Sequence, residues 1–179
     1  MSILAERDRL LLNPEGTEAR YGKDWTVVRG RIVSFGYGHR QLTGDRLDGC
    51  VPAECQHVPR ADMTLDATVQ YYNPHRDPRM RTLTGLDDVV LQRVLDTPGV
   101  VGSIDRAVSL AVDLLDDVAN RRFRQVRLAV GCVGGRHRSV AMAEEIAHRL
   151  WTRHQITFDV AHLDVGKELL QPREHGLRG

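Results

Sequence analysis

The chain has 179 residues, the length of one typical domain. Its 25 Lys and Arg residues nearly balance its 24 Asp and Glu residues, so the formal net charge is +1. This balance excludes an acidic tail protein, and overall charge gives no evidence for nucleic-acid binding. The sequence is 41% hydrophobic and 27% charged, which is typical of a folded globular protein and excludes a disordered chain.

The sequence also indicates the cellular compartment. No apolar run approaches the roughly 18 residues that a membrane-spanning helix needs. Acidic residues interrupt the beginning of the chain, so we expect no signal peptide. The cysteines Cys50, Cys55 and Cys132 are few and odd in number, which favours a reducing setting. We therefore predict a cytoplasmic protein.

The predicted elements alternate between strands and helices. Residues 1–26 form an N-terminal extension with one short helix over 3–12, and the β-branched segment 26–35 predicts the first strand. A loop without periodicity follows over 38–62, and so long a loop in a compact domain is often functional. We then expect, in chain order, a strand over 64–72, a short helix over 89–95, a long helix capped by Ser103, a strand over 126–131, a second long helix and a last strand over 156–163.

The two long helices carry the strongest signal, because apolar residues recur in each at every third or fourth position. The first stripe comprises Ile104, Ala107, Val108, Ala111, Leu115 and Val118, and the second comprises Ala143, Ile146, Ala147, Leu150 and Trp151. The segment 126–131 is almost entirely apolar, as in a strand buried on both faces of a parallel sheet. We predict a single α/β domain over 27–164, with a mostly parallel sheet flanked by helices, and a polar, frayed tail over 165–179.

A glycine- and arginine-rich segment over 130–139 joins the predicted strand to the second helix. Anions bind at such a junction in α/β folds, because the strand ends there and the helix begins. Gly134 and Gly135 let the backbone turn its N–H groups inward, and the helix N-terminus adds a partial positive charge. Arg136 and Arg138 add guanidinium groups, and His137 adds a proton or hydrogen-bond donor. The pattern predicts a phosphate-binding loop.

The spacing from Cys132 to Arg138 and Ser139 also resembles the signature loop of the cysteine-dependent phosphatases. In that family the thiolate attacks phosphorus, the arginine holds the phosphoryl oxygens and the hydroxyl assists departure of the thiol. Gly131 stands where that family has a histidine. A general acid is also needed, and the candidates for it are Asp66, Asp77 and Asp87. Phosphatase activity is therefore an alternative, and we favour a protein that is not an enzyme.

Three ordered motifs resemble the C-terminal domain of the RNase adapter RapZ over about residues 32–164. The first is Ser34-Phe35-Gly36-Tyr37. The second runs from Asn73-Pro74-His75 and Asp77-Pro78 to Leu83-Thr84-Gly85-Leu86-Asp87. The third is the loop over 131–140, in which Val133 stands for the family's threonine and Arg136 for its lysine.

The resemblance implies a fold similar to part of a phosphofructokinase and a sensor or adaptor role. It implies binding of glucosamine-6-phosphate or a related phosphorylated metabolite, such as a nucleotide sugar, and contacts with small RNA and an endoribonuclease. We expect no cofactor, and a homo-oligomer is possible. The expected ligand-binding residues, including an aspartate that the resemblance places at Asp66, are Cys132, Val133, Gly134, Gly135, Arg136, His137, Arg138, Ser139, Asn73, His75 and Asp66.

Two further clusters have weaker signals. Cys50, Cys55 and His57 have no obvious fourth ligand, so we expect an ordinary loop and no metal site. The densest basic run comprises Arg121, Arg122, Arg124 and Arg127. Such a run usually forms a solvated helix end, and RNA contact through these arginines is the alternative. An RNA-binding module without a metabolite is accordingly the second rival function.

Overall fold

The computed structural model describes residues 28–39, 58–68, 71–119 and 125–170, without the side chains of 117–119. Several predictions concern residues outside these ranges. They are the helix over 3–12, most of the loop over 38–62 with Cys50, Cys55 and His57, the side chain of Val118, and three of the clustered arginines, Arg121, Arg122 and Arg124. Arg127 is described, and it lies exposed on a strand.

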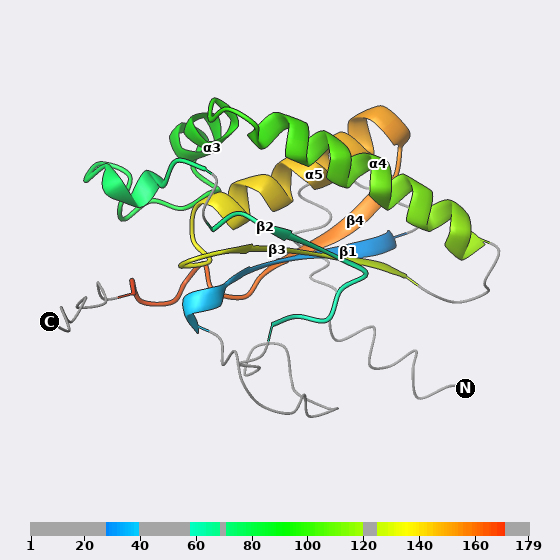
Figure 1. The fold of residues 1–179 in the computed structure, drawn as a ribbon, viewed down its shortest axis with the longest axis horizontal. Helices are drawn as coiled ribbons and strands as arrows, with labels where there is room; N and C mark the ends of the chain where they lie inside the picture. The colour runs from blue at the N-terminus through cyan, green and yellow to red at the C-terminus, as the bar shows by residue number, and fades with distance from the viewer. Residues whose placement is uncertain (1–27, 40–57, 69–70, 120–124, 171–179) are drawn as a thin grey trace, which may run out of the picture.

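Within these ranges, four parallel strands form one sheet in the order β2-β3-β1-β4 (Figure 1). The strands are β1 (Val28–Gly36), β2 (Met63–Asp66), β3 (Val126–Cys132) and β4 (Thr157–His162). Gly36 of β1 pairs with Cys132 of β3, and Asp66 of β2 pairs with Gly131. The carboxyl ends of three strands therefore meet at one edge of the sheet. The predicted α/β fold with a parallel sheet is confirmed.

Three α-helices of the described chain cover one face of this sheet (Figure 1). They are α3 (Asp88–Leu95), α4 (Val100–Ala119) and α5 (Arg138–His154), and the short 3-10 helices η1 (Tyr37–His39) and η2 (Pro74–Arg76) lie at the ends of loops. No helix in the described ranges is long and apolar enough to cross a membrane.

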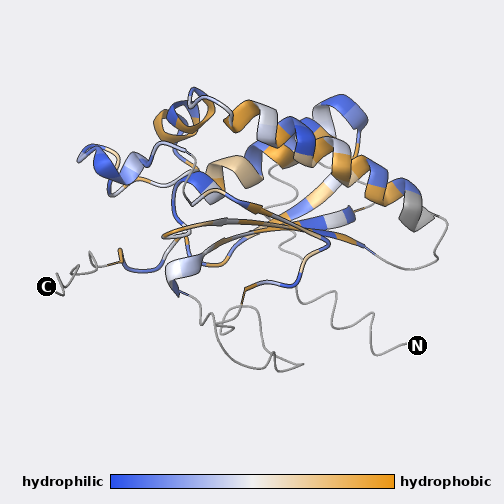
Figure 2. Ribbon diagram, viewed as in Figure 1, coloured by the Kyte–Doolittle hydropathy of each residue, from blue (hydrophilic) through white to orange (hydrophobic). Residues whose placement is uncertain are grey.

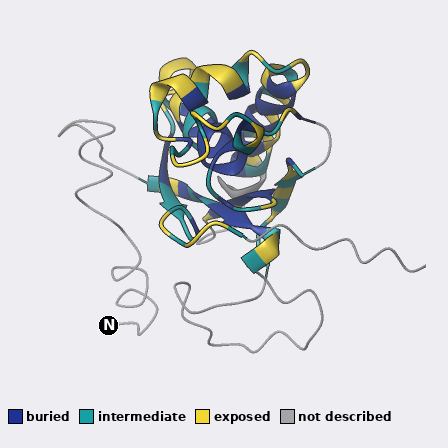
Figure 3. Cartoon of the chain, turned by 90° about the vertical axis from the view of Figure 1, so that its left-hand side faces the viewer, coloured by how far each residue is buried: buried dark blue, intermediate teal, exposed yellow. Residues whose placement is uncertain are grey.

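The core lies between the helices and the sheet. Apolar residues line the inner faces of α4 and α5, and polar residues lie on their outer faces (Figure 2). Buried residues accordingly gather where the helices meet the sheet (Figure 3). Both predicted stripes are buried over their described length, except that Trp151 is only half-buried.

Two element boundaries differ from the prediction. The strand expected over 64–72 ends at Asp66, because the Asp66 carboxylate accepts the Thr68 N–H at 2.8 Å and turns the chain. The helix expected to be capped by Ser103 begins at Val100. Ser103 lies inside that helix, and its Oγ lies 2.6 Å from the Tyr71 hydroxyl. Its polar group is thus satisfied by a tertiary contact and not by capping.

A chain of polar contacts fixes α5 on the sheet. Ser34 on β1 is fully buried, and its Oγ lies 2.8 Å from Nδ1 of His162 on β4. The Nε2 atom of His162 lies 2.8 Å from a carboxylate oxygen of Glu144 on α5. Because a buried polar group that loses its partner costs about 1–3 kcal/mol, these bonds favour one position of the helix. Ser34 has no exposed surface, so we interpret the three residues as structural.

Candidate functional site

The loop between β3 and α5 packs directly against the end of β1. A Cβ atom at Gly36 would lie 2.6 Å from the carbonyl carbon of Gly134 and 2.7 Å from the amide nitrogen of Gly135. Gly135 has a φ of 68°, which side chains disfavour. The Gly36 N–H donates to the buried Asp164 carboxylate at 2.8 Å. Glycines at 36 and 135 therefore allow two backbones to touch where β3 ends.

Cys132 is the last residue of β3 and faces the pocket above this loop. Its Sγ accepts the Gly135 N–H at 3.2 Å and lies 3.1 Å from Oγ of Ser139. Ser139 is fully buried and does not line the pocket. Cys132 is thus part of the pocket wall, and its contacts with Ser139 and Gly135 fix the position of its thiol.

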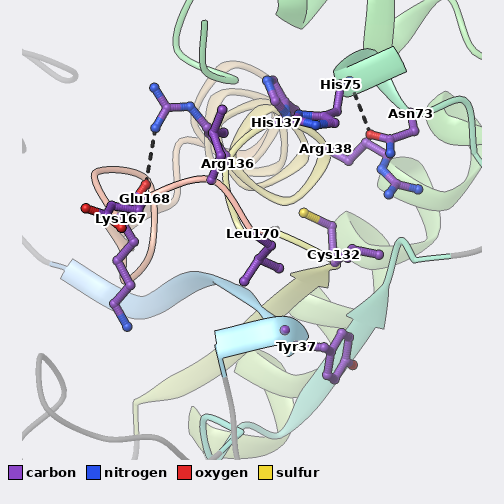
Figure 4. A pocket seen from close by; sticks show the side chains of 14 residues that line it. Tyr37, Asn73, His75, Cys132, Arg136, His137, Arg138, Lys167, Glu168 and Leu170 are labelled. Carbon is purple, nitrogen blue, oxygen red and sulfur yellow. Dashed lines mark hydrogen bonds between the residues drawn. The ribbon is translucent and has the colours of Figure 1, made fainter. Parts of the chain in front are cut away.

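A pocket of about 550 Å³ opens over the loop (Figure 4). Its size lies within the range of about 300–1,000 Å³ that is usual for small-molecule sites. Predicted site residues and several others line it together: Tyr37, Gly38, Asn73, His75, Cys132, Val133, Gly134, Arg136, His137, Arg138, Lys167, Glu168, Leu169 and Leu170.

Arg138, at the first position of α5, is a buried cation in the pocket wall. The residue is only 3% exposed, and its Nη1 donates to the carbonyls of Thr68 at 2.8 Å and Tyr71 at 3.2 Å. Among the described residues, no carboxylate forms an ion pair with its guanidinium. Burial lowers the pKa of Arg138, and the nearby Cys132 and Asp66 act in the opposite direction. An anion in the pocket would supply the missing counter-charge.

Arg136 also reaches the pocket, but its guanidinium is engaged by backbone carbonyls. It donates to Thr82 at 2.7 Å, to Leu83 and Val165 at 3.0 Å, and to Lys167 at 3.5 Å. These bonds hold the segment before α3 and the segment after β4 on either side of the loop. Residues 165–170 of the tail predicted to be frayed are therefore anchored here, and 171–179 lie outside the described ranges.

Two histidines lie side by side on the wall, with their ring centroids 6.1 Å apart. His137 Nε2 lies 3.0 Å from the Met80 carbonyl, so this nitrogen carries the proton and donates. Burial lowers the pKa of His137, and the neighbouring His75 and Arg136 lower it further. Burial and Arg81 lower the pKa of His75 as well. Both rings are therefore neutral near pH 7.

Protonation of His137 is expected to destabilise the fold. Because its folded pKa lies below the unfolded value of about 6.5, the unfolded chain binds more protons as the pH falls through that value. The free energy of unfolding is therefore highest above pH 6.5. It declines as the pH falls from there, until the pH lies below the folded pKa. Urea denaturation from pH 8 to 5 should show a shallower decline for His137→Gln than for wild type. The exposed His148→Gln serves as the control and should follow wild type.

The other predicted residues take different places. Asn73 and His75 line the pocket, and the Asn73 Oδ1 accepts the His75 N–H at 3.3 Å. Asp66 is exposed beside the site and does not line the pocket. Neither does Asp77, which pairs with Arg79 at 3.1 Å, nor Asp87, which accepts two bonds from Thr84. None of the three general-acid candidates thus reaches the cavity.

Sequence reasoning missed part of the wall. Tyr37 is the last residue of the first motif of the RapZ resemblance and Gly38 follows it directly, and that position was the available signal for them. The segment 167–170 had no such signal, because its residues show no periodicity or motif.

Comparison with known proteins identifies relatives of this domain. The family model of the RapZ C-terminal domain matches residues 30–166. A nucleotide-binding protein of Acidothermus cellulolyticus is 35% identical over 146 residues, which cover 79% of this chain and 42% of the relative. Proteins of the same description from an Arthrobacter species and from Frankia alni are 40% and 36% identical over 142 and 141 residues, covering 79% of this chain and 41% and 43% of the relatives.

The chain therefore spans about two fifths of the length of these relatives. The matched residues include all four strands except the first residues of β1, and they include the whole loop from Cys132 to Ser139. The order of the three motifs, the parallel sheet and the family match agree, and the chain belongs to the RapZ C-terminal domain family.

Proposed function

We propose that this domain binds a phosphorylated small molecule in the pocket over residues 132–138 and acts as a sensor or adaptor. One observation carries the proposal: the Arg138 guanidinium is buried in the wall without a carboxylate partner among the described residues. A buried charge without a counter-ion is costly unless a ligand completes it. A phosphate group suits this position, because a guanidinium can bind two of its oxygens at once.

The start of α5 supports the same ligand class. This helix has 17 residues, and its N-terminus carries a partial positive charge beside Arg138. Gly134 faces open space, since no heavy atom lies within 4 Å of the position of a Cβ. A ligand can therefore approach the backbone of the loop closely.

The resemblance to RapZ suggests glucosamine-6-phosphate as the first ligand to test, followed by nucleotide sugars. The relatives are described as nucleotide-binding proteins, so a nucleotide belongs in the same panel. The proposal that the domain contacts RNA or a nuclease rests on the resemblance alone. Of the four clustered arginines, the described one, Arg127, is exposed on β3, where RNA phosphates could reach it.

Isothermal calorimetry with the purified chain tests the proposal. Glucosamine-6-phosphate should bind, and glucosamine without the phosphate should not, because the phosphate makes the contact with Arg138. Inorganic phosphate, a nucleotide sugar and a nucleoside monophosphate complete the panel. If none of the phosphorylated compounds binds at millimolar concentration, the proposed function is wrong.

A cysteine-dependent phosphatase is the rival function, and the contacts of Cys132 favour it. The Gly135 N–H donates to its Sγ, and the Ser139 hydroxyl lies 3.1 Å from it, where the phosphatase resemblance implies a hydroxyl that assists departure of the thiol. However, a side chain at Gly131 has no space, since a Cβ there would lie 2.5 Å from the Tyr37 ring. We expect no hydrolysis of an aryl phosphate. Turnover of about 1 per second that is lost in Cys132→Ser would establish the rival.

A further inference from the structure

The pocket has two chemically different sides. Figure 4 shows Asn73, His75 and Arg138 on one side of the Cys132 thiol, and Tyr37 and Leu170 on the other. The apolar and aromatic side chains among the lining residues are Tyr37, Val133, Leu169 and Leu170. A pocket that bound only a phosphate would need the first side alone. The second side is therefore available to another part of the ligand.

The Tyr37 ring is held in place on this second side. It packs edge-on against Phe35, with ring centroids 4.8 Å apart and planes at 72°. Its Cε2 also fills the space above Gly131, where a Cβ would lie 2.5 Å from it. Burial and the nearby Asp66 raise the pKa of Tyr37, so its phenol is neutral at physiological pH. The ring therefore presents a fixed, uncharged aromatic surface.

Leu169 and Leu170 add apolar side chains to the pocket, and they follow the family match, which ends at residue 166. Arg136 donates to the carbonyls of Val165 and Lys167, and the Lys167 ammonium lies 2.7 Å from Asp164. Leu170 rests on Gly38, where a Cβ would overlap its Cδ1 atom. These contacts hold residues 167–170 in place beside the pocket. The four residues lie outside the segment that the family model matches.

Two of the apolar residues that line the pocket are exposed to solvent. Val133 is 47% exposed and Leu169 is 37% exposed. A ligand group that covers them gains from the release of water, provided that the group is itself apolar. A sugar ring gains less from covering them, because its hydroxyl groups are already hydrated and lose water when they contact apolar side chains. Glu168 on the same segment disfavours the phosphate at this end, which directs the phosphate towards Arg138.

We propose that the pocket selects phosphate esters that carry an aromatic or apolar group, with the phosphate at Arg138 and the apolar group against Tyr37, Val133, Leu169 and Leu170. This selectivity rests on the proposed function, since it assigns the second half of the same ligand. Polar sugar phosphates without such a group are the weaker ligands. The residues after 166 are thereby specificity-determining residues of this chain.

Calorimetry with phenyl phosphate, glucosamine-6-phosphate, inorganic phosphate and phenol tests the selectivity. Phenyl phosphate should bind at least about tenfold more tightly than glucosamine-6-phosphate and inorganic phosphate, and phenol should not bind detectably. Leu169→Ser should remove most of this advantage and leave the affinity for inorganic phosphate unchanged. Leu110→Ser is the matched control, because Leu110 is 42% exposed on α4 and does not line the pocket.

The outcomes separate the two proposals. If phenyl phosphate and glucosamine-6-phosphate bind equally well and Leu169→Ser changes neither, the apolar selectivity is wrong and the phosphate site stands. If Leu110→Ser weakens phenyl phosphate as much as Leu169→Ser does, the effect is not local to the pocket and the selectivity is again wrong. If no phosphorylated compound binds, both proposals are wrong.

Discussion

Arg138→Ala is expected to weaken the binding of glucosamine-6-phosphate by about 10- to 150-fold. The reason is that a charge-assisted hydrogen bond to phosphate contributes roughly 1.5–3 kcal/mol, and 1.4 kcal/mol corresponds to a factor of ten. Arg138→Lys keeps the charge but loses the planar donor pair, so its affinity should fall between those of Arg138→Ala and wild type. Calorimetry of the three proteins measures the difference.

The control for this prediction lies on the same helix. Arg153 is at the opposite end of α5, pairs with Asp105 at 2.7 Å and does not line the pocket. Arg153→Ala should leave the affinity unchanged. Because Arg138→Ala also removes bonds to the Thr68 and Tyr71 carbonyls, its folding must be checked by thermal unfolding. A folded Arg138→Ala protein that binds with wild-type affinity would place the phosphate elsewhere.

Gly135→Ala is expected to lower the free energy of unfolding by about 2–5 kcal/mol. The φ of 68° costs an alanine about 1–2 kcal/mol, and overpacking typically adds about 1–3 kcal/mol. The added Cβ would lie 2.5 Å from the Gly36 nitrogen and 2.8 Å from Asp164 Cβ, so the end of β1 and the loop would have to separate. Urea denaturation measures the loss.

The adjacent glycine provides the matched control. Gly134 has a negative φ and no heavy atom within 4 Å of a Cβ position, so Gly134→Ala should change the free energy of unfolding by less than about 1 kcal/mol. Equal effects of the two substitutions would contradict the close packing of the loop on β1. The comparison thus tests the backbone contact that shapes the pocket, independently of any ligand.

Local sequence patterns predicted the elements that hold the site. The apolar run of β3 and the stripes of α4 and α5 place their buried residues correctly, because periodicity reports which face of an element meets the core. The end of β2 and the start of α4 differ from the predicted boundaries, for reasons that local patterns do not contain. The turn at Asp66 depends on one side-chain bond to Thr68, and Ser103 is satisfied by Tyr71, which lies 32 positions earlier.

Arg136 shows the same limit within the site. Its place in a basic, glycine-rich loop predicts a phosphate contact, yet its guanidinium meets carbonyls from residues 82–83 and 165–167. Arg138, two positions later, has no carboxylate partner among the described residues and faces the pocket. The two arginines are alike in the sequence, and only the segments folded around them distinguish their roles.

The α/β class, the buried strand, the helix that follows and the loop from Cys132 to Ser139 were predictable from the sequence, because those features depend on residues close together in the chain. What faces that loop depends on contacts between distant segments. Parallel pairing places β1 beside β3 and brings Tyr37 to the pocket, and Leu170 packs on Gly38 from 132 positions away. Local periodicity does not report contacts between such distant residues, so the wall that Tyr37 and Leu170 form could not be predicted from the sequence.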